Sequence, residues 1–225
     1  MTVQHSGAGA CATNGVVVPE QAAPRRPSPS ARAAERAVVR DLRGRSGPEK
    51  LVFAPGDLVV VSGLPGSGKT TLIQRTVRGP RLDSQDSRDR WAAFMPRFLP
   101  YALYRPLVRL AHYARLRGTL RSGAEAVVHD CGTQAWVRRW LAREARRRGA
   151  SLHLVLLDVD PATALAGQRE RGRGVSRYAF TRHRGAVRRL VRAAEAGRTP
   201  AGCASVVLLD RETAGTLRVL GFRVG

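Results

Sequence analysis

The stretch that fixes the fold reads Val59-Val60-Val61-Ser62-Gly63-Leu64-Pro65-Gly66-Ser67-Gly68-Lys69-Thr70-Thr71-Leu72-Ile73. Residues 63–70 match the pattern G-x-x-x-x-G-K-T, and they lie between a β-branched apolar run and the start of a helical pattern. Glycines let the backbone curl around an anion and turn its N–H groups inward. The stretch therefore predicts a strand, a phosphate-binding loop and a helix, in that order.

A nucleoside triphosphate is the ligand that this pattern indicates. Lys69 is expected to reach the β- and γ-phosphates, and the Thr70 hydroxyl to enter the coordination shell of Mg²⁺. The positive end of the helix dipole adds to the attraction for phosphate. A chance glycine-rich turn is the alternative, and the complete pattern in this context argues against it. Contacts with ATP are predicted for Gly63, Leu64, Pro65, Gly66, Ser67, Gly68, Lys69, Thr70 and Thr71.

Length and charge limit the classes of protein that this chain can represent. Its 225 residues suit one α/β domain with a sizeable core and an appendage. The formal net charge is +22, and 37 of the 39 basic residues are arginine, since only Lys50 and Lys69 are lysine. Such a bias, with abundant alanine and glycine, is typical of GC-rich coding and favours solvated arginine faces over a dedicated nucleic-acid surface. The high charge keeps nucleic acid open as a partner.

Cysteine usage and hydropathy indicate the compartment. Cys11, Cys131 and Cys203 are odd in number, far apart in sequence and without zinc-ligand spacing, which favours a reducing cytoplasm. Residues 1–15 lack a basic region followed by an apolar one, and no stretch approaches the roughly 18 apolar residues of a membrane span. We therefore expect neither export nor contact with a membrane.

Composition divides the chain into three parts. Residues 1–30 are rich in Ala, Gly, Pro and Ser and are expected to form a disordered tail. Residues 31–48 are expected to form a short helix over 31–42 and a linker. Residues 49–225 are expected to form the ATP-binding domain, with a small strand at 51–53 leading into its first core strand.

Strand and helix patterns alternate through that domain. Strands are predicted at 58–62, from 81, and at 126–130, 151–158 and 205–209, and helices include 69–78, 101–121 and 181–196. This alternation predicts the α/β class, with a three-layer P-loop NTPase fold in which helices cover both faces of a mostly parallel five-stranded sheet. The helix at 101–121 is expected to be amphipathic. Its apolar side comprises Leu103, Leu107, Leu110 and Ala114, and its polar side Arg105, Arg109 and His112.

Ligands bind beyond the carboxyl ends of parallel strands, and unusual residues follow several of these strands. Asp130 ends an apolar run, which makes it the predicted second Mg²⁺ ligand, with capping of the next turn as the alternative. Asp83 and Asp86 are candidate bases and Arg88 a candidate clamp on phosphate or substrate; a capped, salt-bridged helix start explains each of them about equally well. One or two arginines of an arginine- and glycine-rich lid over 169–182, with Arg173 as the candidate, would neutralise phosphate charge, and the other arginines would be ordinary surface.

These motifs together resemble the P-loop kinases that include zeta-toxin-like kinases, chloramphenicol phosphotransferase and the kinase domain of polynucleotide kinase. The resemblance covers about residues 51–211. It implies a base three residues before the clamping arginine, where this chain has Gln85. Asp83 is preferred over Asp86 as the base, because a residue at a strand tip points toward the cleft more predictably.

The expected activity is Mg²⁺- and ATP-dependent transfer of the γ-phosphoryl group to a hydroxyl of a small molecule. The chain has no N/T-K-x-D motif of a GTPase, and His129-Asp130-Cys131 lacks the Asp-Glu pair of a mechanical ATPase. The alternative is an ATP-binding regulatory protein with a basic, nucleic-acid-associated surface and no substrate phosphorylation. The acceptor and the oligomeric state are left open by the sequence.

Overall fold

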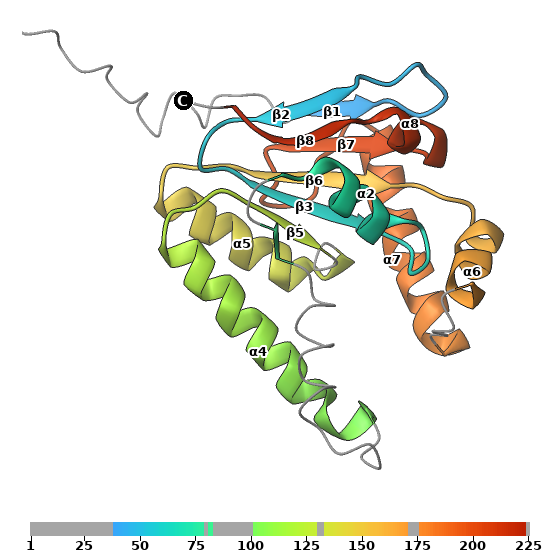
Figure 1. Ribbon diagram of the computed structural model, residues 1–225, viewed down its shortest axis with the longest axis horizontal. Helices are drawn as coiled ribbons and strands as arrows, with labels where there is room; N and C mark the ends of the chain where they lie inside the picture. Colours follow the sequence, from blue (N-terminus) through green and yellow to red (C-terminus); the bar gives the residue numbers. More distant parts are fainter. Residues whose placement is uncertain (1–37, 79–80, 83–100, 130–132, 171–175, 224–225) are drawn as a thin grey trace, which may run out of the picture.

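Parallel strands form the centre of the molecule (Figure 1). The computed structural model describes residues 38–78, 81–82, 101–129, 133–170 and 176–223. The main sheet has the strand order β1-β7-β6-β3-β5-β4, and every strand pair in the described part of the chain is parallel. The strands are β1 (Val38–Asp41), β3 (Leu58–Gly63), β4 (Arg81–Leu82), β5 (Ala126–His129), β6 (Leu152–Leu157) and β7 (Ser205–Leu209).

The predicted five-stranded parallel sheet is present as β4-β5-β3-β6-β7, so the predicted fold class is confirmed. β3 lies inside the sheet between β5 and β6, and all of its residues are buried. An apolar, β-branched run suits this position because both faces of the strand are covered. The phosphate loop that follows β3 is therefore carried by an interior strand.

β1 is a sixth strand, at a place where the sequence predicted a helix. Residues 38–41 pair with β7, from Val38 opposite Ser205 to Asp41 opposite Leu208. The prediction of a helix over 31–42 is wrong for this part. Val38 and Val39 are β-branched, and the edge of β7 presents unpaired backbone groups that a strand satisfies and a helix does not.

Helices cover both faces of the main sheet. The buried side chains of α4 (Tyr101–Arg121), α5 (Ala135–Arg147) and α7 (Arg177–Glu195) form one apolar cluster with one face of the sheet. α2 (Lys69–Thr76) and α8 (Arg211–Thr216) contribute to a second cluster on the other face. α6 (Pro161–Arg169) follows β6 beside the phosphate loop (Figure 1). No helix in the described ranges is long and apolar enough to cross a membrane.

A second, two-stranded parallel sheet joins segments from the two ends of the domain. The predicted strand at 51–53 is present as β2 (Lys50–Phe53), and its partner is β8 (Val219–Phe222). Leu51 and Leu220 are buried in the same cluster as α2 and α8. This two-stranded sheet, which we call the ribbon, therefore completes the layer on the α2 side of the main sheet.

α4 packs through a different side from the one predicted. Its described buried residues are Val108, Leu116 and Leu120, with His112 between them, whereas Leu107 and Leu110 are 48% and 67% exposed. Both sets recur every three or four residues, so periodicity alone did not distinguish them. Contact with α5 and the sheet decides the orientation, because Leu116 and Leu120 belong to the common cluster with Val137 and Leu141.

A buried carboxylate joins three segments at the amino edge of the sheet. Asp57 is 4% exposed and accepts N–H groups from Ser151 (2.8 Å) and Ala54 (3.2 Å). Its Oδ2 also lies 2.9 Å from His153 Nε2, and His153 Nδ1 lies 2.7 Å from Ser205 Oγ. The carboxylate therefore accepts hydrogen bonds from several part-buried groups that would otherwise lack this partner.

Replacement of Asp57 by alanine is expected to lower the free energy of unfolding by about 3 kcal/mol, because it removes a buried carboxylate and leaves several part-buried donors without an acceptor. Urea unfolding at neutral pH measures this change. Asp160→Ala is the matched control, since Asp160 also accepts two backbone N–H groups, from Ala162 and Thr163, but is exposed. Its expected loss is about 1 kcal/mol. Equal losses for the two variants would contradict a role for burial.

Candidate phosphate-binding site

The predicted phosphate loop connects β3 to α2 at the carboxyl edge of the sheet (Figure 1). Gly66 and Gly68 have φ angles of +86° and +95°, so both lie in the left-handed region. Gly68 is the N-cap residue of α2 and makes no side-chain capping bond. The first N–H groups of α2 therefore point out of the helix without a side-chain acceptor at the cap, which is the arrangement that binds an anion.

Lys69 lies along this loop. It is 5% exposed, and its Nζ donates hydrogen bonds to the carbonyl oxygens of Leu64 (2.7 Å) and Gly63 (3.1 Å). These bonds place a buried positive charge beside the curled backbone. A phosphate group bound there would find both N–H donors and a cation.

Two observations fit a phosphate group to this loop. The Ser67 hydroxyl is buried and has no hydrogen-bond partner among the described residues. A Cβ atom built at Gly63 would lie 2.6 Å from the carbonyl oxygen of Leu157 and 3.1 Å from Ser67 Oγ, so the loop approaches β6 more closely than any side chain permits. The backbone thus forms a cradle with a buried hydroxyl group available inside it.

α6 packs directly against the loop, a contact that the sequence did not predict. Gln168 donates from Nε2 to the carbonyl oxygen of Pro65 at 3.0 Å. A Cβ atom at Gly66 would lie 2.0 Å from the Ala164 carbonyl oxygen, and one at Gly167 would lie 2.7 Å from the Gly66 carbonyl oxygen. The spacing of Ala164 and Gly167, three residues apart on a helix, is the signal in the sequence that indicates this close approach. α6 ends at Arg169, the first residue of the segment predicted to form the lid.

The predicted metal ligands are only partly described. Thr70 is half-buried near the start of α2. Asp130 lies outside the described residues, directly after β5. Within the described residues, no group of three or more His, Cys, Asp or Glu side chains could hold a metal ion. The Mg²⁺ site therefore stays a prediction.

The other predicted catalytic residues, Asp83, Asp86, Arg88 and Arg173, also lie outside the described residues. The strands that lead to two of these segments are described. Leu82 in β4 pairs with Val128 in β5, and Val61 in β3 pairs with His129 in β5. Since these strands are parallel, the chain leaves β4 and β5 at the same edge of the sheet as the phosphate loop.

Arg43, which the sequence did not single out, joins three elements at this edge. Its guanidinium donates to Asp41 at the end of β1, to Asp158 after β6 (2.6 Å) and to Glu195 at the end of α7 (3.0 Å). The hydrogen bonds from Arg43 hold the pKa of Asp41 below its ordinary value. Arg43 thereby fastens α7 to the sheet. The predicted lid over 169–182 overlaps this helix, because residues 177–182 form the beginning of α7. Two of the three partners of Arg43, Asp158 and Glu195, lie 115 and 152 residues away in the sequence, so no local pattern reveals them.

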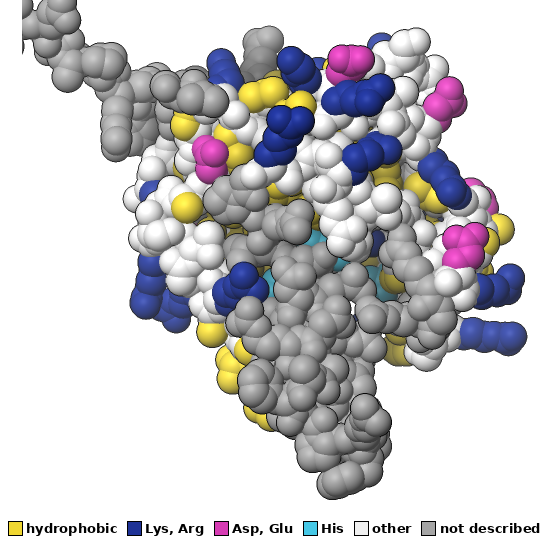
Figure 2. All heavy atoms as spheres, viewed as in Figure 1, with side chains coloured by type: hydrophobic (Ala, Val, Ile, Leu, Met, Phe, Trp, Pro, Cys, Tyr) yellow, Lys and Arg dark blue, Asp and Glu magenta, His cyan; other side chains and the backbone are white. Residues whose placement is uncertain are grey.

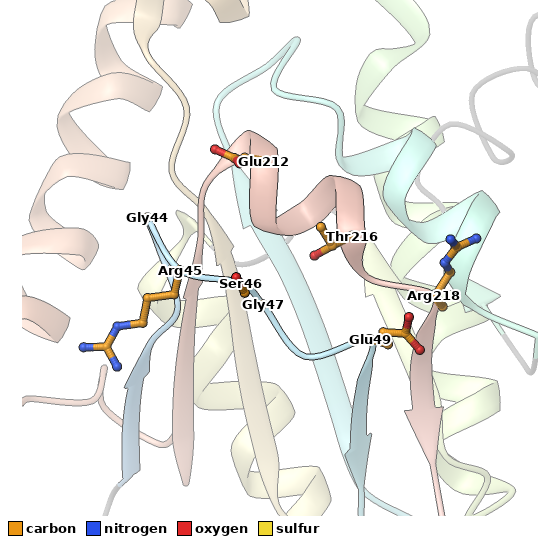
Figure 3. Close-up of a pocket in the computed structure, with 8 residues that line it drawn as sticks. All are labelled: Gly44, Arg45, Ser46, Gly47, Glu49, Glu212, Thr216 and Arg218. Carbon is orange, nitrogen blue, oxygen red and sulfur yellow. The ribbon is translucent and has the colours of Figure 1, made fainter.

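A shallow pocket of about 550 Å³ lies between α8 and the segment that joins β1 to β2 (Figure 3). Figure 3 shows that its charged side chains do not gather at one point: Arg45 points away from the other residues, and Glu212 lies at the opposite end of α8 from Glu49 and Arg218, which lie next to each other. No residue of the phosphate loop lines it, and we assign it no ligand. Its lining residues are Gly44, Arg45, Ser46, Gly47, Glu49, Glu212, Thr216 and Arg218.

Comparison with known proteins identifies the family. Residues 58–196, more than half of the chain, match the AAA_33 family, which is described as an AAA domain. The chain belongs to this family. The match spans the phosphate loop, β5 and α6, and it confirms the resemblance to P-loop kinases inferred from the sequence. A search of curated proteins finds no match.

Solved structures share the fold of this AAA domain protein at low sequence identity. A structure from the PezAT toxin–antitoxin system of Streptococcus pneumoniae is 16% identical, covering 73% of this chain and 72% of that chain, with a TM-score of 0.53. A kinase candidate from Chloroflexus aurantiacus is 15% identical, covering 70% of this chain and 86% of that chain, with a TM-score of 0.50. The tunicamycin resistance protein of Deinococcus radiodurans is 18% identical, covering 62% and 81% of the two chains, with a TM-score of 0.40. The first two support the three-layer fold.

Proposed function

We propose that this AAA domain protein is a Mg²⁺- and ATP-dependent kinase that transfers the γ-phosphoryl group to a hydroxyl of a small molecule in a reducing cytoplasm. The observation that carries the proposal is the phosphate loop itself. The loop that leads into α2 contains a buried ammonium group, left-handed glycines and a buried hydroxyl that has no hydrogen-bond partner among the described residues. Together they suit the terminal phosphates of a nucleotide.

Each part of the loop has a role in holding the nucleotide. Backbone N–H groups of the loop and the Lys69 ammonium would bind the β- and γ-phosphates, with the exception of Pro65, which has no N–H, and of Ser67, whose N–H donates to the Leu64 carbonyl oxygen (3.1 Å). The Thr70 hydroxyl together with Asp130 would hold Mg²⁺. When bound, Mg²⁺·ATP supplies the phosphoryl group, and the metal neutralises charge on its oxygens. Since Lys69 is buried, its charge acts in a region with little water, where electrostatic attraction is stronger than at an exposed site.

The acceptor side of the reaction rests on the residues that follow β4 and β5. Asp83, with Asp86 as the alternative, would accept the proton of the hydroxyl, and Arg88 would clamp the acceptor or the migrating phosphoryl group. Arg173 in the lid would stabilise the charge on that group. The contact of α6 with Pro65 and Gly66 supports a connection between lid and loop, because α6 ends at the first residue of the lid segment.

Phosphoryl transfer can be tested without knowing the acceptor. Purified protein is incubated with γ-labelled ATP, Mg²⁺ and pools of hydroxyl-bearing metabolites, nucleosides and oligonucleotides, and the products are separated by chromatography. Label is expected in one pool of small molecules, and its appearance should require Mg²⁺. Calorimetric titration with Mg²⁺·ATP is run in parallel. Protein that binds ATP in the titration but transfers no label would contradict the kinase proposal and favour an ATP-binding regulator.

A further inference from the structure

Arginine is concentrated on one side of the molecule. α4, α5 and α7, with 21, 13 and 19 residues, carry five, five and six arginines, and their only acidic residues are Glu144 and Glu195. Both acids are already in ion pairs, with Arg147 (2.9 Å) and Arg43 (3.0 Å). These three helices form the layer over one face of the main sheet, and we call its outer surface the helical face.

A uniform coding bias does not explain this distribution. α2, α6 and α8, with 8, 9 and 6 residues, carry one arginine each, and α8 also carries a glutamate. The view in Figure 2, in which α2 lies toward the viewer, shows acidic side chains among the basic ones. If codon composition alone placed the arginines, all exposed helices would be enriched alike. The helical face therefore carries an excess of positive charge. Its arginines repel one another, and a bound anion would relieve this repulsion.

The exposed side of α5 shows how an anionic chain would lie. Trp136, Arg139, Arg143 and Arg147 are exposed and follow one another at intervals of three or four residues, so they form one stripe along the helix. The stripe thus offers about one cation per helical turn of about 5.4 Å. α7 repeats the pattern with further exposed arginines at the same intervals, namely Arg184, Arg188 and Arg192.

An aromatic cluster stands at the beginning of this stripe, where α4 meets α5. Trp136 is 52% exposed, and its ring lies edge-on to that of Tyr113 with a centroid separation of 5.3 Å. Tyr113 also contacts Trp140 edge-on at 6.1 Å. The indole N–H of Trp136 donates to Gln134 Oε1 at 2.8 Å, which fixes the ring. Proteins that bind single-stranded nucleic acid combine such a half-exposed aromatic ring with a row of cations. The bases stack on the ring, and the phosphates contact the cations.

We propose that the helical face binds single-stranded nucleic acid, independently of the phosphate loop. Arginines of α5 and α7 contact the sugar–phosphate backbone, and Trp136 stacks on a base near the start of α5. Charge alone would also attract an anionic membrane, but the fixed aromatic ring at the junction of two helices favours a base. The binding is expected to show little sequence preference, because every base offers a face for stacking.

The test measures fluorescence anisotropy of labelled dT and U oligonucleotides between about 50 and about 200 mM salt. Arg139, Arg143 and Arg188 are changed together to glutamate. The matched control changes three cations on the ribbon side, Lys50, Arg218 and Arg223, to glutamate, which removes the same net charge. For single strands the slope of log K against log salt is negative, and each lost phosphate contact reduces its magnitude by about 0.7. The slope of the first variant should therefore be smaller in magnitude by about 2, and its affinity lower by at least about tenfold. The control should stay within about twofold of wild type, because charges more than about 10 Å from the strand are screened.

Trp136 provides an independent readout. Trp136→Ala is expected to weaken oligonucleotide binding about tenfold without changing the salt slope, and Trp136→Phe is expected to restore most of the affinity. All variants are first checked by urea unfolding and by titration with Mg²⁺·ATP, which should match wild type. Equal losses for the two triple variants, or binding of wild type to phosphatidylglycerol vesicles but not to oligonucleotides, would overturn the proposal.

Discussion

Replacement of Lys69 by alanine is expected to weaken Mg²⁺·ATP binding on the order of 10²-fold and to reduce phosphoryl transfer on the order of 10³-fold. The physical reason is the position of the ammonium group. It is buried and held by the carbonyl oxygens of Gly63 and Leu64, so its loss removes a positive charge from the interior of the loop. Calorimetric titration measures the first effect, and γ-labelled ATP the second.

The chain offers an internal control, because Lys50 is its one other lysine. Lys50 is exposed on β2, and Lys50→Ala should leave ATP affinity unchanged. An ATP analogue with a lysine-reactive acyl phosphate adds a direct readout. Mass spectrometry should find Lys69 modified in preference to Lys50, and excess ATP should protect Lys69 alone. ATP binding by the Lys69→Ala protein with wild-type affinity would contradict the assignment of the phosphate loop.

Replacement of Gly66 by alanine is expected to destabilise the protein by about 3 kcal/mol or more and to abolish ATP binding. Its new Cβ would lie 2.0 Å from the carbonyl oxygen of Ala164 and 2.8 Å from Gln168 Cγ, in addition to the strain of a left-handed backbone. Because the nearest obstacle is the backbone carbonyl group of Ala164, which cannot rotate away as a side chain can, the loop and α6 must separate. Urea unfolding and ATP titration measure the two effects.

Gly68→Ala is the matched control for this prediction. Gly68 has a similar φ angle of +95°, but nothing lies within 4 Å of a Cβ atom built there. Only the conformational strain remains, which is about 1–2 kcal/mol. The difference between the two variants therefore isolates the contact of the loop with α6. If both lost the same stability, packing against α6 would have no role in shaping the loop.

The sequence predicted best what is encoded locally. The phosphate loop was recognised because its glycines, Lys69 and Thr70 form a contiguous pattern between a strand and a helix. Strands β3, β5, β6 and β7 were recognised because an apolar run in a parallel sheet is buried on both faces and needs no partner to be identified. These elements place the loop, and their order accounts for the predicted fold class.

Features that depend on distant contacts were missed. β1 is a strand because β7 presents an open edge, and the residues of 38–41 alone also fit a helix. The buried side of α4 is selected by α5, since Leu107 and Leu116 belong to equally regular apolar sets. The contact of Gln168 with Pro65 depends on how α6 meets the loop. In each case the deciding partner is far away in sequence.

The roles predicted for Asp83, Asp86, Arg88, Asp130 and Arg173 stay predictions, because these residues lie outside the described part of the chain. The described strands support them only indirectly, by leading to the same edge of the sheet. Variants at Lys69 and Gly66 test the nucleotide side of the site, where the structure gives contacts and distances.

The pairing of β1 with β7 and of β2 with β8 has a consequence for synthesis on the ribosome. The strands made first, at 38–53, find their partners only at 205–222, so the edge of the main sheet and the two-stranded ribbon cannot form until nearly the whole domain has emerged. The AAA domain match ends at residue 196, before either partner has been made. Until then Leu51 cannot join Leu217 and Leu220, which belong to the same buried cluster in the folded protein. The nascent chain would thus hold an open sheet edge for most of its translation, which makes it a substrate for chaperones that bind exposed strands.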